Sequence, residues 1–245
     1  MKRVKLTVAY DGTNYHGWQV QPNGNTIEAE LNRHLSELLG EEIRVTGASR
    51  TDAGVHALGN VAVFDTSARM PAEKISYAMN TRLPEDIRIQ ESCEVAPDFH
   101  PRFCRTVKTY EYRILNRRFP DPTKRLYSYF YYYPLDVEKM KTAAAYLVGE
   151  HDFQSFCTMK PDLENTVRRI YSLDIEKEGD MILMRVTGNG FLYNMVRIIA
   201  GTLIRVGGGF IPPESMQAIL EGKNRKLAGE TARPEGLTLV EIQYI

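Results

Sequence analysis

The sequence contains little cysteine and no stretch of the kind that crosses a membrane. Only three of its 245 residues are cysteine, none of them in a Cys-x-x-Cys pair, and it has no Asn-x-Ser/Thr glycosylation acceptor. These absences argue against a disulfide-stapled secreted protein and favour a reducing cytoplasm. There is no apolar run of about 18 residues, and the apolar residues near the N-terminus alternate with polar ones. We therefore expect neither a membrane span nor a signal peptide.

Net charge is also absent, because 31 Lys and Arg residues balance 31 Asp and Glu residues. A uniformly basic coat for nucleic acid is thereby excluded. Residues 101–125 depart from the balance, with eight basic side chains against two acidic ones. The eight are Arg102, Arg105, Lys108, Arg113, Arg117, Arg118, Lys124 and Arg125. This excess is typical of a surface that contacts phosphates, and equally of a solvated strand and loop.

Motifs for nucleotide, zinc and serine chemistry are missing as well. Gly12 and Gly17 have the spacing of a phosphate-binding P-loop, but Trp18 and Gln19 stand where Lys and Ser/Thr are required. The five histidines include no His-x-x-x-His pair and none with a cysteine at ligand spacing. No Gly-x-Ser-x-Gly elbow occurs. The sequence therefore gives no indication of ATP, NAD or structural zinc.

The remaining composition is that of a globular protein, with 43% hydrophobic and 25% charged residues. Alternation and helical spacing predict a first series of elements and, after Pro101, a second one. The first has strands at 4–10, 43–45, 59–65 and 87–95 and helices at 27–39 and 71–83. The second has strands at 106–115, near Tyr127, around Tyr171 and Met184 and at 237–242, and helices at 136–148, at 192–206 and from Pro212. This order predicts an α+β fold with a largely antiparallel sheet, and we interpret the aromatic run at 127–133 as core.

A polar turn between two apolar strands carries the most informative carboxylate. The segment GASRTDAGVHA, residues 47–57, places Arg50, Thr51 and Asp52 between small residues. A carboxylate on such a turn can project into a cleft, while its small neighbours let a substrate approach. An Asx-turn, in which Asp52 bonds only to backbone amides, explains the segment equally well.

A single charged residue interrupts an apolar helical stretch late in the chain. Arg197 is flanked by Met195, Val196, Ile198 and Ile199. Arginine is rarely buried without a partner, because removing a guanidinium from water costs roughly several kcal/mol. We therefore expect Arg197 to have a carboxylate or an anionic ligand as its partner, the alternative being that its head group reaches the surface.

Four segments, in this order, resemble the tRNA pseudouridine synthase A family. They are VAYDGTNYHGWQ, GASRTDAGVHA, KTYEYRI and GNGFLYNMVRIIAGTL, and together they extend from the first strand to the last helices. The string RTDAGVHA is highly specific for the family. One departure is Ser49, which stands where the family pattern usually has glycine.

The resemblance implies isomerisation of uridine to pseudouridine in the anticodon stem-loop of tRNA, at about positions 38, 39 and 40, without metal or cofactor. It also implies a homodimer in which one tRNA touches both subunits. Two related α/β subdomains, residues 1–105 and 106–245, would share a largely antiparallel central sheet, with helices packed on it and a cleft between them. The first would carry the RTDAGVHA loop, and the second the tyrosine and the buried arginine of the site.

Site residues follow from the resemblance position by position. Asp52 corresponds to the catalytic carboxylate, and Arg50 works beside it on the displaced nucleotide. Tyr110 stacks on the base and is a candidate to take the proton from C5. Arg197 pairs with Asp52, and Leu237 makes an apolar contact with the base.

The reaction suits a lone carboxylate, which can attack C1′, as in retaining glycosidases, or add to C6 of the ring. The sequence does not choose between these routes. Two other classes explain part of the pattern. A non-catalytic RNA-binding module would use the basic segment and the aromatic residues but gives no role to the Arg-Thr-Asp turn. A hydrolase that uses Asp52 would need a second acid or a metal.

Overall fold

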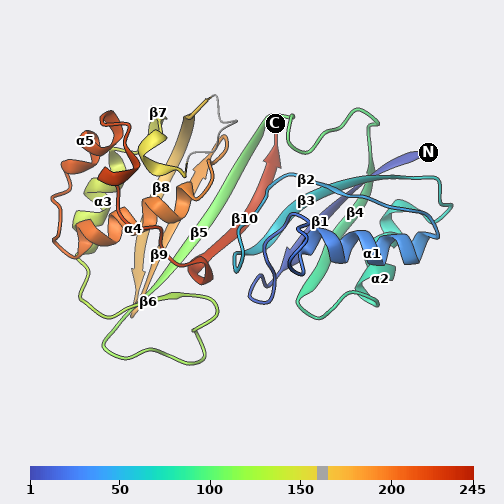
Figure 1. Ribbon diagram of the computed structural model, residues 1–245, viewed down its shortest axis with the longest axis horizontal. Coiled ribbons are helices and arrows are strands. Elements are labelled where there is room, and N and C mark those ends of the chain that lie inside the picture. The colour runs from blue at the N-terminus through green and yellow to red at the C-terminus, as the bar shows by residue number, and fades with distance from the viewer. Residues whose placement is uncertain (159–164) are drawn as a thin grey trace. The chain divides into compact units, whose positions relative to one another are not determined.

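The computed structural model describes residues 1–158 and 165–245 of the chain (Figure 1). Its residues form two compact units: unit 1 holds residues 1–106 and 238–245, and unit 2 holds residues 107–237. The strand at the C-terminus thus belongs to the same unit as the N-terminus. No helix in the described part of the chain is long and apolar enough to cross a membrane.

Unit 1 is built on a mixed sheet in which β1 lies between β3 and β4, antiparallel to both. The short β2 pairs antiparallel with β3, and β10 pairs parallel with the start of β3. The strands are β1 (Lys2–Tyr10), β2 (Thr46–Gly47), β3 (His56–Thr66), β4 (Ile87–Val95) and β10 (Leu237–Tyr244). Both β1 and β10 therefore contact β3, the strand that follows the RTDAGV loop.

Local sequence explains the elements of unit 1. In β1 every second residue from Val4 to Tyr10 is buried, as the alternation predicts. Helix α1 (Ile27–Leu39) begins where the Thr26 hydroxyl accepts a hydrogen bond from the Ala29 amide at 3.3 Å. It ends at Gly40, whose φ of 71° is the left-handed conformation that glycine adopts without strain. Figure 1 shows α1 and α2 (Ala72–Asn80) together beside these strands.

Unit 2 has an antiparallel sheet in the order β5, β9, β8, β7, with β6 pairing parallel to β5. The strands are β5 (Thr106–Asn116), β6 (Tyr129–Tyr131), β7 (Gly149–Asp152), β8 (Val167–Glu178) and β9 (Met181–Gly188). Helices α3 (Val137–Ala145), α4 (Met195–Gly207) and α5 (Ser215–Glu221) gather beside β7, β8 and β9 (Figure 1). Single turns of 3-10 helix lie at Gln154–Phe156, Arg225–Leu227 and Pro234–Gly236.

The α+β class and the largely antiparallel pairing are confirmed, as are all the long strands. The strand expected at 43–45 is wrong, because those residues are irregular and the pairing begins at β2. The helix expected at 71–83 ends at Asn80, and the one expected at 136–148 ends at Ala145. No pattern in the sequence predicted β7.

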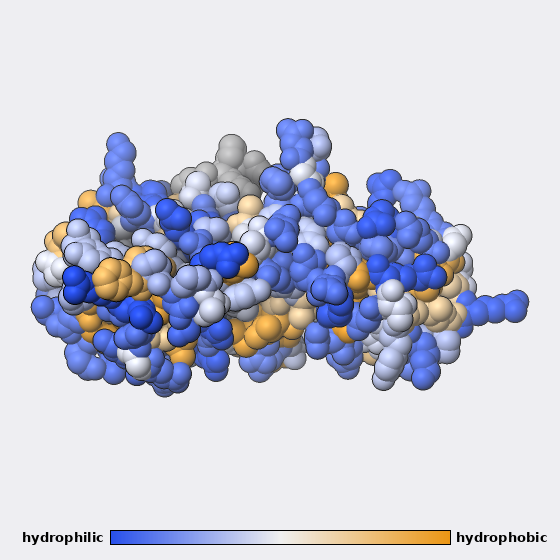
Figure 2. All heavy atoms as spheres, turned by 90° about the horizontal axis from the view of Figure 1, so that it is seen from below, coloured by the Kyte–Doolittle hydropathy of each residue, from blue (hydrophilic) through white to orange (hydrophobic). Residues whose placement is uncertain are grey.

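Interpreting the aromatic run at 127–133 as core is also wrong. Tyr127, Tyr132 and Tyr133 are 46–59% exposed, and the other three aromatic rings are half-buried. The reason is that β6 has only three residues, so most of the run lies outside regular structure. The rings pack partly on one another, with those of Tyr132 and Tyr133 4.5 Å apart. On one face of the molecule, Figure 2 shows hydrophobic residues in separate patches among hydrophilic ones.

Candidate active site

The loop between β2 and β3, residues 48–55, carries the arginine and aspartate of the RTDAGVHA string and is tied to the sheet where it begins. The Ala48 amide donates a hydrogen bond of 2.7 Å to the carbonyl of Val61 in β3. The side-chain amide of Asn60, in the same strand, donates at 3.0 Å to the carbonyl of Ser49. These two bonds fix the backbone just before the arginine.

The loop that follows β1 holds the same segment from another side. The Trp18 amide donates to the carbonyl of Thr51 at 3.1 Å. Gly17 has a φ of 85°, and a Cβ atom on it would lie 2.6 Å from that carbonyl oxygen. A Cβ atom on Gly12 would lie 2.0 Å from the carbonyl oxygen of Val55. The two glycines with P-loop spacing therefore let two backbones approach closely, which no other residue type permits.

Buried polar side chains complete the attachment. The hydroxyl groups of Tyr10 and Thr51 lie 2.7 Å apart, and the Asn60 side-chain amide donates to the Tyr10 hydroxyl at 3.2 Å. His56 Nδ1 accepts a hydrogen bond from the Gly12 amide at 3.1 Å. Sequence reasoning alone missed Tyr10, Asn60 and His56. One signal was present, because Asn60 is a polar residue at the head of the apolar run VAVF.

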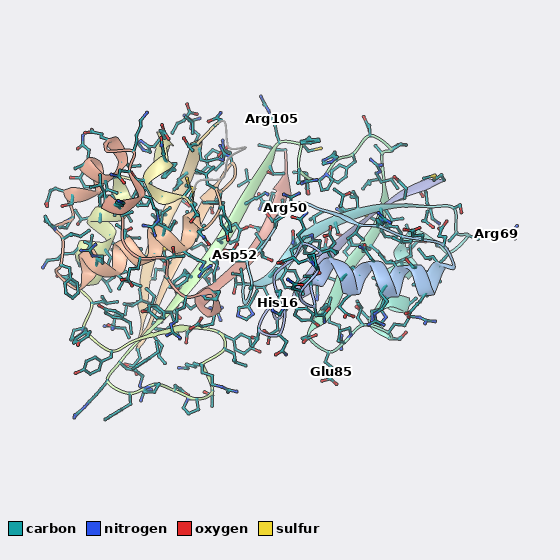
Figure 3. All side chains as sticks on the ribbon, viewed as in Figure 1. His16, Arg50, Asp52, Arg69, Glu85 and Arg105 are labelled. Atoms are coloured by element: carbon teal, nitrogen blue, oxygen red, sulfur yellow. The ribbon has the colours of Figure 1, made fainter. Side chains whose placement is uncertain are left out.

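The side chains of the loop alternate in exposure, so that Thr51 is covered while its two charged neighbours can reach a substrate. Thr51 is buried, whereas Arg50 is exposed and Asp52 is half-buried. Figure 3 shows Arg50 and Asp52 as neighbours in unit 1. Ala53 and Gly54 follow and add almost no side-chain bulk. A carboxylate on an anchored backbone, with small residues beside it, can act as a nucleophile at a sugar carbon or at a ring carbon.

Tyr110 lies in β5 of unit 2 and is 9% exposed. Its ring and the Phe191 ring form a T-shaped pair, with centroids 5.2 Å apart and planes at 82°. Tyr112, on the same face of the strand, is fully buried and donates its hydroxyl to the carbonyl of Arg233 at 2.8 Å. Burial raises the pKa of Tyr112 well above its usual range. The role of Tyr110 in base stacking stays a prediction.

Glu111 points to the opposite face of β5 and is the centre of an ion-pair cluster. It accepts hydrogen bonds from Arg113 at 2.8 Å and from Arg185 at 3.0 Å. Burial acts to raise the pKa of Glu111, but the hydrogen bonds and charges of the two arginines outweigh it and hold that pKa below its usual range. The cluster therefore stabilises the sheet of unit 2 in the ionised state of Glu111.

Arg197 lies in the first turn of α4, half-buried. Its Nε donates to the carbonyl of Ala232 at 2.7 Å and its Nη1 donates to Oδ1 of Asn194 at 3.2 Å. Asn194 has a φ of 62°, and its amide donates to the Thr158 hydroxyl at 3.1 Å. The Ala232 carbonyl and Asn194 Oδ1 are neutral groups, and they orient the Arg197 guanidinium. The expected carboxylate partner of Arg197 stays a prediction.

The predicted site residues are divided between the two units. Arg50 and Asp52 share one loop of unit 1, whereas Tyr110, Arg197 and Leu237 belong to unit 2. Leu237 is buried at the first position of β10. Among the residues that the structure describes, no three His, Cys, Asp or Glu side chains are grouped so that they could hold a metal ion.

The basic segment at 101–125 is largely accessible, because seven of its eight basic side chains are exposed and Lys108 is half-buried. Arg117 lies 3.6 Å from Asp180, and the guanidinium of Arg118 lies 5.1 Å from the centre of the Phe119 ring. Exposed pairs of this kind contribute little stability, so the side chains can exchange them for another anion.

Comparisons with known proteins agree over nearly the whole chain. A family model described as tRNA pseudouridine synthase matches residues 6–104 and 143–245. The tRNA pseudouridine synthase A of Thermoanaerobacter sp. (strain X514) is 48% identical over 244 residues, covering 100% of both chains. That of Acetivibrio thermocellus is 47% identical over 244 residues, again with 100% of both chains covered. Among solved structures, the archaeal box H/ACA Nop10–Cbf5 complex aligns over 96% of this chain and 46% of that chain, with 13% identity and a TM-score of 0.35.

Proposed function

The chain belongs to the tRNA pseudouridine synthase family, which isomerises uridine to pseudouridine in tRNA, and we propose that it acts on the anticodon stem-loop at about positions 38, 39 and 40. The support for this position is the identity of about half the residues with tRNA pseudouridine synthase A over the full length. The observation that carries the assignment of the active site is the half-buried Asp52 on a loop whose backbone is bonded on both sides of Arg50.

Asp52 is proposed as the catalytic carboxylate. In the reaction the N1–C1′ bond breaks, the uracil turns, and a C5–C1′ bond forms. The proton on C5 is lost and N1 gains one, so substrate and product are isomers. Asp52 donates an electron pair either to C1′, displacing the base, or to C6 of the ring, and leaves again when the new bond forms. Both routes regenerate the free carboxylate.

Three further roles follow from the types of the residues. The target base must leave its stack, at a cost of roughly a few kcal/mol, and the exposed Arg50 fills the space that it vacates. The Tyr110 ring stacks on the extruded uracil, and its hydroxyl oxygen takes the C5 proton while the hydroxyl gives its own proton to the solvent. Arg197 pairs with Asp52, and Leu237 contacts the base.

The basic segment at 101–125 is proposed to contact tRNA phosphates, which its exposed side chains allow. We propose further that the chain works as a homodimer in the cytoplasm, with one tRNA touching both subunits. The support for this assembly is the family relationship, and sedimentation of the chain with and without tRNA tests it.

The proposed function is tested with tRNA transcripts that carry tritium at C5 of uridine, because tritium is released when pseudouridine forms. We expect release from transcripts with uridines at the anticodon-arm positions, in the presence of a chelator. A matched transcript with cytidine at those positions should release none. An RNA-binding module would give no release from either transcript, and equal release from both would place the target elsewhere in the tRNA.

A further inference from the structure

Three polar side chains from separate parts of unit 1 meet under the catalytic loop. Tyr10 is the last residue of β1, Asn60 lies within β3, and Thr51 lies in the loop between Arg50 and Asp52. All three are buried, and Asn60 is 0% exposed. The Tyr10 and Thr51 hydroxyl oxygens are 2.7 Å apart, and Asn60 Nδ2 lies 3.2 Å from the Tyr10 hydroxyl and 3.0 Å from the Ser49 carbonyl.

The hydrogen bonds of this cluster run toward the loop. Asn60 uses its side-chain amide as donor to both the Tyr10 hydroxyl and the Ser49 carbonyl, and the Tyr10 hydroxyl shares a second hydrogen bond with Thr51 Oγ1. The bonds therefore end on the residue before Arg50 and on the residue after it. Arg50 lies between the two attachment points, and Asp52 comes directly after the second.

Sheet stability alone does not account for these residue types. Asn60 stands opposite Val8 of β1 and directly precedes the apolar run of β3, where an aliphatic side chain would be buried without any need for a partner. A buried amide must instead be satisfied, and here Tyr10 and the loop satisfy its donors. The backbone of the loop already has its own bonds from Ala48 and Trp18, so the cluster adds orientation to a segment that is attached without it.

We propose that Tyr10, Asn60 and Thr51 form a positioning cluster that fixes the direction of Arg50 and Asp52 for catalysis. The inference rests on the proposed function of Asp52. None of the three side chains acts on the reacting atoms themselves, because each acts through the backbone on either side of Arg50. A displacement of about 1 Å in a reacting group lowers a rate by about 100-fold, so loss of one hydroxyl should slow the chemical step by about 10–100-fold.

The test uses the two conservative substitutions that Thr51 allows. Thr51→Val keeps the shape and removes the hydroxyl, whereas Thr51→Ser keeps the hydroxyl and removes a methyl group. If the cluster positions the loop, Thr51→Ser should convert tRNA within about threefold of the wild-type single-turnover rate and Thr51→Val should be about 10–100-fold slower. If the side chain only fills space, the order should reverse, because Val preserves the packed volume.

Tyr10→Phe gives a second, independent measurement, with Tyr244→Phe as its control. Tyr244 is also in unit 1 and donates its hydroxyl to a backbone carbonyl, that of Pro101 at 3.1 Å, outside the catalytic loop. We expect Tyr10→Phe to lower the single-turnover rate by about 10–100-fold while the dissociation constant for tRNA changes less than about threefold. Tyr244→Phe should leave both quantities at the wild-type value.

Urea midpoints of all four variants separate catalysis from folding. A wild-type rate for Tyr10→Phe, or equal rates for Thr51→Ser and Thr51→Val, overturns the inference, as does a loss of rate for Tyr244→Phe equal to that for Tyr10→Phe. If Tyr10→Phe does not fold, the Thr51 pair decides alone. No conversion by the wild-type protein would overturn the proposed function itself, a result distinct from fast conversion by the variants.

Discussion

Replacing Gly17 by alanine should displace the neighbouring loop, which carries Asp52, the proposed catalytic carboxylate. Gly17 has a φ of 85°, and its Cβ would lie 2.6 Å from the Thr51 carbonyl oxygen, 3.1 Å from the Ala53 amide nitrogen and 3.1 Å from the carbonyl carbon of Asp52. All three atoms belong to backbone, which cannot turn aside as a flexible side chain can. To reach an ordinary contact of about 3.4 Å, one loop must move by about 0.8 Å.

Gly17→Ala should have two effects: backbone strain lowers the stability of the protein, and displacement of the loop lowers the rate. Alanine at a left-handed position costs about 1–2 kcal/mol wherever it occurs. The contact with Thr51 adds to this, so Gly17→Ala should lower the free energy of unfolding by about 2–4 kcal/mol. A shift of nearly 1 Å in the backbone beside Asp52 should lower the single-turnover rate by about 10–100-fold.

Gly40→Ala is the matched control for strain. Gly40 has a φ of 71° at the end of α1, and a Cβ on it would meet nothing within 4 Å. The Gly40→Ala variant should lose about 1–2 kcal/mol in its free energy of unfolding and should keep its full activity. The assay is tritium release under single turnover, with urea unfolding of each variant. If Gly17→Ala converts tRNA within twofold of the Gly40→Ala rate, the close approach of the two loops does not position Asp52.

Three further predictions concern unit 2. Tyr110→Phe keeps the ring, so we expect normal tRNA affinity and stalled release of C5 tritium; full activity would remove the proton-transfer role. Reversing the charges of Arg117 and Arg118 to Glu should reduce the log–log salt dependence of tRNA binding by about 0.7–0.9 for each tRNA phosphate that the protein no longer neutralises, and an unchanged slope would exclude this surface. Glu111→Gln should cost about 1–3 kcal/mol at pH 7. Because the folded-state pKa of Glu111 is lowered, this stability is fully present above the unfolded pKa of about 4.3 and is lost as pH falls through the folded-state pKa. A wild-type advantage that is as large at about pH 3 as at pH 7 would contradict it.

The sequence predicts best what depends on local patterns. Alternation along β1 and helical spacing along α1 give elements that agree with the structure to within a few residues. The pairing of β10 with β3 escapes such reasoning, because it joins residues that lie far apart in the sequence, such as Thr238 and His56, and leaves no local signal. The prediction that the aromatic run is core is wrong for a related reason. Whether Tyr132 is buried depends on which other segments cover it, and the neighbouring strand β6 has only three residues.

The site shows the same division. RTDAGVHA identifies the loop and its carboxylate from the sequence, since the residue types are in one string. Its attachment is not readable there, because Tyr10, Gly17 and Asn60 are separated from the loop by up to about 40 residues and contact it only in the fold. Gly17 illustrates the limit: its spacing to other glycines suggests a phosphate loop, whereas its φ and its distance to Thr51 show a backbone contact.

Conversion by Asp52→Asn is the most direct test of the role of Asp52 as the catalytic carboxylate. The amide keeps the shape of the side chain but cannot serve as a carboxylate nucleophile. Tritium release from an anticodon-arm uridine should be measured under single turnover, together with the dissociation constant for tRNA and the urea midpoint. We expect no detectable release, with tRNA affinity and stability near those of the wild-type protein. Release within tenfold of the wild-type rate would contradict this role.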